Sequence, residues 1–204
     1  MEEFKNNTVI VQGIVASELQ YSHEVYGEKF YTFLVSVKRL SDTSDCIPII
    51  ISENFFEDDM LHVGCCVHIL GRFSSYNLHQ EGRNKLLLYV TVQLIEVLKK
   101  TDEHEFINHI FLDGYICKEP TYRETPLGRN ISYLLIAVNR SYGKSDYLPA
   151  ICWSNNALLA SYLKVGAHIQ IEGRIQSRVY VKKLSETEKE ERVAYEVSVS
   201  KLTI

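Results

Sequence analysis

The chain contains the same sequence pattern twice, and this internal repeat limits the possible folds more than any other feature. At an offset of 101 residues, "NTVIVQGIV" (7–15) aligns with "NHIFLDGYI" (108–116), and "GEKFYTFLVSVKR" aligns with "GRNISYLLIAVNR". After one inserted residue the match resumes at an offset of 102, where "LHVGCCVHILGRFSS" aligns with "LKVGAHIQIEGRIQS". Two copies of one domain therefore fill the 204 residues, and we expect domains at 1–100 and 106–204. The polar joint "KKTDEHEF" is too short for the copies to tumble independently.

Each copy contains five apolar, strand-like segments separated by Gly or polar turns. In the second copy these segments are residues 109–118, 130–140, 146–153, 168–180 and 193–203. The stretch "SNNALLASYLKVG" (154–166) is typical of a short helix, with Ser154 or Asn155 as its N-cap and Gly166 at its end. Five strands with a helix between the third and fourth is the order of an OB fold, in which the sheet closes into a barrel. The sequence thus predicts an all-β protein of two tandem five-stranded OB-fold barrels, with one short helix per copy.

Composition and motifs exclude several functional classes. No apolar run approaches the roughly 18 to 20 residues that span a bilayer, and the acidic start "MEEFKNNT" is unlike a signal peptide, so we expect a cytoplasmic protein with no membrane partner. The five cysteines are scattered, which indicates reduced thiols and not a disulfide framework. The seven histidines show no metal-binding spacing, and the chain lacks a nucleophile motif and a phosphate-binding loop. The sequence therefore predicts no enzyme activity, no metal and no cofactor.

The segment "RSYGKSDYLPAICW" (140–153) combines aromatic and basic side chains. On a strand, period 2 places Tyr147 and Trp153 on one face and Leu148, Ala150 and Cys152 on the other. An aromatic platform contributes about 1 to 3 kcal/mol per stacked base without reading sequence, while neighbouring cations hold phosphates. Each tyrosine could instead be half-buried filler on a strand, and Trp153 could pack under the helix that follows it.

The second copy resembles the bacterial single-stranded DNA-binding protein family over nearly all of residues 108–203. The resemblance rests on "NHIFLDGYICKEPTYRETPLGR", "LLIAVNRSYGKSDYLPAICW", "ASYLKVGAHIQIEGRIQSRVY" and "YEVSVSKLTI". In that family, aromatics at four places on one barrel face stack on bases, and the matching residues here are Tyr142, Tyr147, Trp153 and Tyr180. The cations available for phosphate contacts are Arg123, Arg129, Arg140, Lys144, Arg174, Arg178, Lys182 and Lys183. Arg174 could equally be a solvated charge at a strand end.

The first copy resembles the family more weakly and lacks the aromatic set. The four equivalent positions hold Ser41, Cys46, Ser52 and Leu78, and Tyr76 is a candidate remnant. Residues 1–104 contain 9 Lys and Arg against 15 Asp and Glu, whereas residues 105–204 contain 13 against 11. A polyanion such as DNA is attracted more strongly to the less acidic second copy. We therefore expect the second copy to bind DNA and the first copy to be structural. A weak phosphate path through Lys38, Arg39, Arg72, Arg83 and Lys85 remains an alternative.

The resemblance implies a protein that binds and protects single-stranded DNA in replication, repair and recombination. It also implies a homodimer, because relatives use four OB folds and two chains would supply four. Replication proteins are possible partners, although the sequence ends at "VSKLTI" without the acidic tail that recruits enzymes in such relatives. The alternative is a tailless primosomal-type replication accessory protein that acts through protein–protein contacts. Single-stranded RNA also remains open as a ligand, since stacking alone does not exclude a 2′-OH.

Overall fold

The computed structural model describes residues 6–39, 41, 43–57, 59–80, 83–99, 105–183 and 189–204, without the side chains of 79–80, 83–85, 142, 182–183 and 189. The first repeat contains β1 (Asn7–Val15), β2 (Gln20–Val25), β3 (Glu28–Lys38), β4 (Ser44–Ser52), β5 (Cys66–Gln80) and β6 (Arg83–Leu98). The second contains β7 (Ile107–Ile116), β8 (Thr121–Glu124), β9 (Asn130–Asn139), β10 (Ser145–Trp153), β11 (His168–Lys183) and β12 (Lys189–Thr203). The strands expected in the second repeat are therefore present, and the short strand β8 was not predicted.

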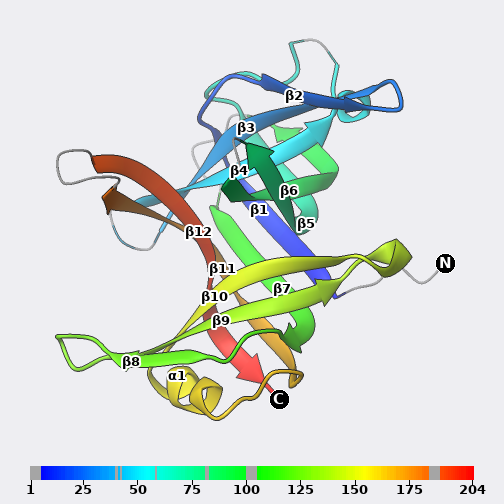
Figure 1. The fold of residues 1–204 in the computed structure, drawn as a ribbon. Helices are drawn as coiled ribbons and strands as arrows, with labels where there is room; N and C mark the ends of the chain where they lie inside the picture. The colour runs from blue at the N-terminus through cyan, green and yellow to red at the C-terminus, as the bar shows by residue number, and fades with distance from the viewer. Residues whose placement is uncertain are drawn as a thin grey trace.

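Both repeats close into a barrel by the same set of strand pairs (Figure 1). In the first repeat β1 pairs with both β5 and β3, and β4 pairs in parallel with β6. In the second, β7 pairs with β11 and β9, and β10 pairs in parallel with β12. The short strand β2 pairs with β3, and the short strand β8 pairs with β9, both antiparallel. This is the OB-fold topology, so the prediction of two tandem OB-fold barrels is confirmed.

The prediction of one short helix per copy is right for the second repeat only. Its helix α1 spans Ser154–Ser161, and it ends before the expected Gly166, which lies at a φ of +90° in the turn that leads into β11. The residue at the N-cap position is Trp153, and no side chain caps the helix. The first repeat has only a 3-10 turn, η1 (Glu53–Phe55), at the equivalent place. The Ala- and Leu-rich second copy has the stronger helix formers there, which accounts for the difference. No helix in the described ranges is long and apolar enough to cross a membrane.

The two repeats join edge to edge through an antiparallel pair of β1 and β7. In this register Val9 lies opposite Ile110, which is its own equivalent at the repeat offset of 101. The junction is therefore close to twofold symmetric, and it connects the strands into one 12-stranded sheet.

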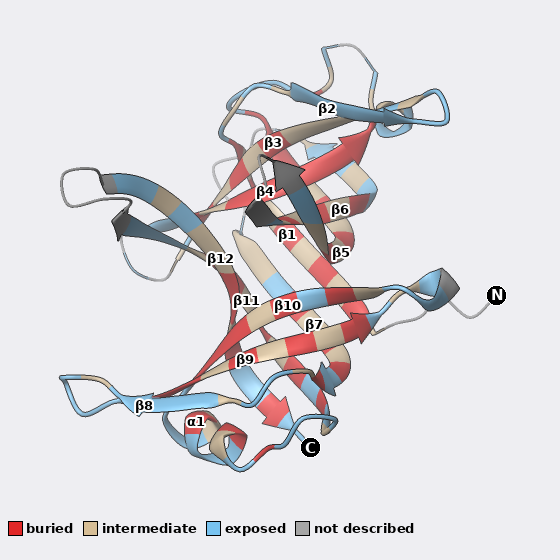
Figure 2. Ribbon diagram, viewed as in Figure 1, coloured by how far each residue is buried: buried red, intermediate tan, exposed pale blue. Residues whose placement is uncertain are grey.

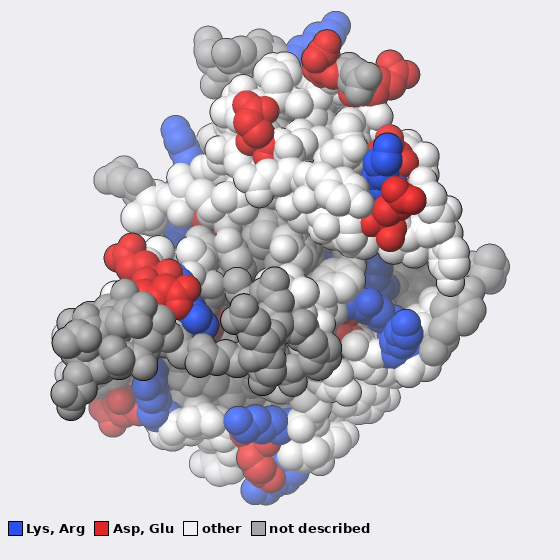
Figure 3. All heavy atoms as spheres, turned by 45° about the horizontal axis from the view of Figure 1, so that its top comes forward, with Lys and Arg blue, Asp and Glu red and all other residues white. Residues whose placement is uncertain are grey.

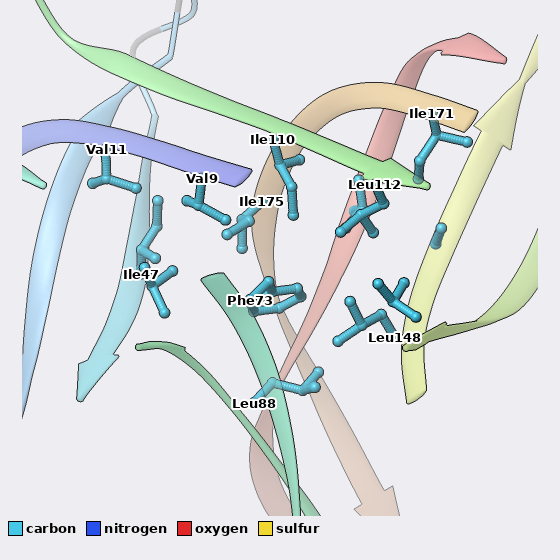
Figure 4. Close-up of a cluster of buried hydrophobic side chains, with 14 of the residues drawn as sticks. Val9, Val11, Ile47, Phe73, Leu88, Ile110, Leu112, Leu148, Ile171 and Ile175 are labelled. Atoms are coloured by element: carbon cyan, nitrogen blue, oxygen red, sulfur yellow. The ribbon is translucent and has the colours of Figure 1, made fainter. Parts of the chain in front are cut away.

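One apolar core runs through both repeats. Burial alternates along β1 and β7, as the strand period requires (Figure 2). Figure 4 shows Phe73 of β5 among side chains of both repeats, with Val9 and Ile47 from the first and Ile110 and Ile175 from the second. Because these side chains form one cluster, unfolding one repeat would expose apolar surface of the other.

Close backbone contacts explain why both repeats have a glycine at the same position, Gly13 in the first and Gly114 in the second. A Cβ at Gly13 would lie 2.4 Å from the Ser36 carbonyl oxygen, and one at Gly114 would lie 2.6 Å from the Ala137 oxygen. Both contacts occur where the first strand of a repeat meets β3 or β9 to close the barrel. Only glycine allows this approach.

Candidate nucleic-acid interface

The outer face of β10 carries two of the predicted stacking residues. Tyr147 is 46% exposed and Trp153 is 36% exposed, whereas Leu148 and Cys152, on the opposite face, are buried. Neither ring packs on another aromatic ring among the described residues. Strand alternation therefore presents both rings outward, as the sequence pattern indicates.

The other two predicted stacking residues belong to elements other than β10. Tyr180 is 36% exposed on β11, in the hairpin that β11 forms with β12, and the Arg178 guanidinium lies 5.9 Å from the centre of its ring. Tyr142 belongs to the 3-10 turn η2 (Ser141–Gly143) before β10, and its side chain is outside the described residues. The four predicted positions thus come from three elements.

Tyr133 is an aromatic residue on this face that the sequence interpretation missed. It lies on β9 opposite Ile151, and therefore on the same side of the sheet as Tyr147 and Trp153. Arg123 donates a hydrogen bond to the Tyr133 hydroxyl at 2.5 Å and lies 4.9 Å from the ring centre. Alternation within "NISYLL" was the available signal, but only the β9–β10 register places this tyrosine on the same face as the other two.

The predicted phosphate-contacting cations fall into three groups. Arg123, Arg129 and Lys144 are exposed, and the side chain of Arg178 is 53% exposed with Glu196 3.8 Å away. Lys182 and Lys183 lie on β11, but their side chains are outside the described residues. Arg140 and Arg174 are bonded to buried carboxylates. On the face drawn in Figure 3, the visible Lys and Arg side chains form small groups interspersed with acidic ones.

Arg140 is held at the boundary between the repeats. Its Nε donates to Asp146 Oδ2 at 2.7 Å, its Nη2 also donates to this carboxylate, and Nη2 reaches the Ser75 carbonyl oxygen at 2.9 Å. Asp146 is fully buried. The hydrogen bond to Asp146 raises the pKa of Arg140 despite its partial burial, so the guanidinium stays charged.

Arg174 takes part in the equivalent cluster of the other repeat. Its Nη1 donates to Asp45 Oδ2 at 2.6 Å, and Asp45 also accepts from Arg39 Nε at 2.9 Å. Asp45 is 1% exposed. Two guanidinium groups from different repeats therefore share one buried carboxylate, which ties the repeats together.

The first repeat has no aromatic residue at the four equivalent positions. Ser41 is exposed, Cys46 is half-buried, Ser52 is buried and Leu78 is 38% exposed. Of the cations in the alternative phosphate path, Arg39 is paired with Asp45, and burial lowers the pKa of Arg72. The side chains of Arg83 and Lys85 are outside the described residues.

A different aromatic group occurs in the first repeat, and the sequence interpretation did not find it. His23 and Phe30 stack with ring centres 5.0 Å apart, and with Tyr26, Glu28 and Tyr76 they line a cavity of about 320 Å³. Tyr76 is half-buried, and its hydroxyl lies 3.3 Å from Thr91 Oγ1. The β2–β3 hairpin brings His23, Tyr26 and Phe30 together, and Tyr76 comes from β5, so only the tertiary structure completes the group.

A comparison with protein families assigns the second repeat. Residues 107–204 match the model of the single-strand binding protein family. The C-terminal repeat belongs to this family. A single-stranded DNA-binding protein of Bacillus cereus is 32% identical over 81 residues, which cover 36% of this chain and 48% of the relative. Single-stranded DNA-binding protein 1 of Lactococcus lactis is 35% identical over 81 residues, covering 36% and 54%. The chain thus spans about half the length of the curated relatives it matches.

The likeness to single-strand binding proteins extends to the fold of both repeats. The wild-type single-stranded DNA-binding protein from Thermus aquaticus superposes over 97% of this chain and 91% of its own, with a TM-score of 0.78 and 19% sequence identity. At this identity the comparison establishes the tandem OB-fold architecture alone.

Proposed function

We propose that this protein binds and protects single-stranded DNA, without reading its sequence and without catalysis, mainly through the C-terminal repeat. The observation that carries the proposal is the outward pair Tyr147 and Trp153 on one strand face, each ring exposed and without an aromatic partner in the described part of the chain. Bases of any identity can stack on such rings. Membership of the C-terminal repeat in the single-strand binding protein family supports this ligand.

Phosphates are held, in this proposal, by the exposed cations beside the rings. Arg123, Arg129, Lys144 and Arg178 fill this role, together with the predicted Lys182 and Lys183. Arg140 and Arg174 would reach a phosphate only in competition with Asp146 and Asp45. We therefore assign these two arginines to holding the repeats together, and the N-terminal repeat to a structural role.

Tryptophan fluorescence tests the proposed function directly, because Trp153 is the only tryptophan. We expect oligo-dT to quench its emission, with a footprint of roughly 4 to 16 nucleotides per active OB fold. Mixed-sequence DNA should bind comparably, and duplex DNA should bind far more weakly. Unchanged emission and no complex at saturating oligo-dT would contradict the proposal. If RNA of equal length binds more tightly, single-stranded RNA and not DNA is the ligand.

A second copy of the chain is the proposed protein partner. The β11–β12 hairpin extends the core-facing side of its strands beyond the barrel, where Val179, Val181 and Val193 are 64%, 56% and 49% exposed. An exposed apolar strip of this kind is suited to burial against another copy, which would bring four OB folds together.

Light scattering tests the homodimer. We expect a mass about twice the 23.5 kDa of one chain, and Val179→Lys should shift it toward the monomer because a charge would enter the apolar contact. Val165→Lys is the control, since Val165 is 55% exposed elsewhere on the surface. A wild-type monomer at micromolar concentration would refute the homodimer and leave DNA binding untouched.

A further inference from the structure

The backbone at Tyr147 lies on an edge of β10 that its own repeat leaves uncovered. β10 pairs with β9 along one side over its whole length, but on the other side the register with β12 covers only Ala150 and Ile151. N–H groups of alternate residues point to the same edge of a strand, and Pro149 has none to offer. The Tyr147 N–H is therefore an edge donor that needs a partner from elsewhere.

That partner comes from the N-terminal repeat. The Tyr147 N–H donates to Ser75 Oγ at 2.9 Å. Ser75 is itself fixed, because its N–H donates to Asp146 Oδ1 at 2.6 Å and its carbonyl accepts from Arg140 at 2.9 Å. One serine of β5 thus contacts three residues at or just before the start of β10, namely Arg140, Asp146 and Tyr147.

We propose that Ser75 is a positioning residue for the single-stranded DNA site: the N-terminal repeat fixes the strand edge from which the Tyr147 ring projects. This inference rests on the proposed function. It gives the N-terminal repeat a part in binding although that repeat has no stacking residues at the equivalent positions. The rigidity of the platform comes from a residue 72 positions away in the sequence.

The repeat supplies a matched control for this proposal. Ser177 is the equivalent of Ser75 at the offset of 102, and its Oγ accepts from the Cys46 N–H at 3.3 Å. Its N–H donates to Asp45 Oδ1 at 2.9 Å, and its carbonyl lies 3.4 Å from Arg39 Nη2. The two serines make the same set of contacts, but Ser177 holds the edge of a strand with Cys46 where Ser75 holds Tyr147.

The test measures oligo-dT affinity and unfolding by urea for Ser75→Ala, Ser75→Thr and Ser177→Ala in the full chain. We expect Ser75→Ala to weaken binding by about three- to tenfold, the effect of losing one hydrogen bond that orders the site. Ser75→Thr keeps the hydroxyl acceptor and should bind like wild type. Ser177→Ala should lose as much stability as Ser75→Ala and keep its affinity.

The outcomes separate this inference from the proposed function. Equal affinity for Ser75→Ala and wild type, or equal losses of oligo-dT affinity for Ser75→Ala and Ser177→Ala, would overturn the positioning role while DNA binding stands. Failure of the wild-type chain to bind oligo-dT would instead overturn the proposed function. Urea unfolding of the same samples shows whether each variant is folded. If Ser75→Ala is unfolded, its loss of affinity says nothing about positioning, and the affinity of Ser75→Thr relative to wild type then decides the question.

Discussion

Tyr147 and Cys46 occupy the same position in the two repeats, and the difference between them is the difference between the proposed roles of the repeats. Both follow a buried Asp on the strand, and both donate a backbone N–H to a serine of the other repeat. Only Tyr147 can offer a ring to a base. The backbone geometry is shared, so the side chain alone decides which face can stack.

Replacing single aromatic residues should show which repeat binds DNA. We expect Tyr147→Ala and Tyr180→Ala each to weaken oligo-dT binding by about 1 to 3 kcal/mol, because each removes a stacking surface. Cys46→Ala is the matched control at the equivalent position, and Tyr76→Ala should cost much less than Tyr147→Ala. Titrations that find Tyr76→Ala as damaging as Tyr147→Ala, with the fold intact by circular dichroism, would assign binding to both repeats.

Cys152 gives a residue-scale prediction about pH. Burial raises the pKa of its thiol to about 12, above the value of about 8.5 in an unfolded chain. The folded state holds the proton more tightly, so this contribution to stability is complete below about pH 8.5 and is lost as the pH rises toward 12.

Denaturant unfolding at several pH values checks this thiol. Above about pH 9, the unfolding free energy of wild type should fall with pH more steeply than that of Cys152→Ala, by up to about 1.4 kcal/mol per pH unit. Parallel pH profiles of the two proteins would show that Cys152 does not titrate as its burial implies.

At the scale of elements, the β5–β6 hairpin and the β11–β12 hairpin each reach the other repeat. The β5 strand reaches β10 at Ser75, and β11 reaches β4 at Ser177. A buried carboxylate stands at each crossing, Asp146 in one and Asp45 in the other. The crossings make the tandem repeat one folding unit, because each needs groups from both copies.

Removing a crossing carboxylate should destabilise the whole chain. Asp45→Asn leaves Arg39 and Arg174 without their shared anion, and we expect the unfolding free energy to fall by about 3 kcal/mol. Glu190→Gln is the control, since its partner Arg192 lies on the exposed end of the same β11–β12 hairpin. A single cooperative urea transition should persist in both. Two separate transitions in wild type would contradict the single folding unit.

For the whole molecule, charge is divided between the repeats: residues 1–104 are acidic and residues 105–204 are slightly basic. A polyanion is therefore attracted to one end of an otherwise acidic protein. Few described cations remain exposed beside the rings, so stacking has to supply a large share of the affinity.

Salt dependence measures that share. Each neutralised phosphate of a single strand contributes a slope of about −0.7 to log affinity against log salt. The four cations whose side chains are described therefore predict a slope of about −3, and all six, with Lys182 and Lys183, predict about −4. Double substitution of Arg123 and Lys144 by Gln should reduce the slope by about 1.4, whereas Tyr147→Ala should leave it unchanged. A slope near zero would contradict the proposed phosphate contacts. A slope near −10 would contradict the large share of the affinity assigned to stacking.

The sequence by itself determined the repeat, the five barrel strands of each copy, and the outward direction of Tyr147 and Trp153. These features follow from local periodicity and turn residues, which residues close in the chain encode. It also separated the copies by charge and aromatic content, because both are properties of composition.

The tertiary structure alone decided the partners of Arg140 and Arg174, the place of Tyr133 beside the platform, and the contact of Ser75 with Tyr147. Ser75 lies 71 residues from Asp146, and Arg174 lies 129 residues from Asp45. Such contacts depend on the register of β1 with β7 and on where the two hairpins cross. No local pattern encodes these, because the same alternation of side chains is compatible with many registers between distant strands.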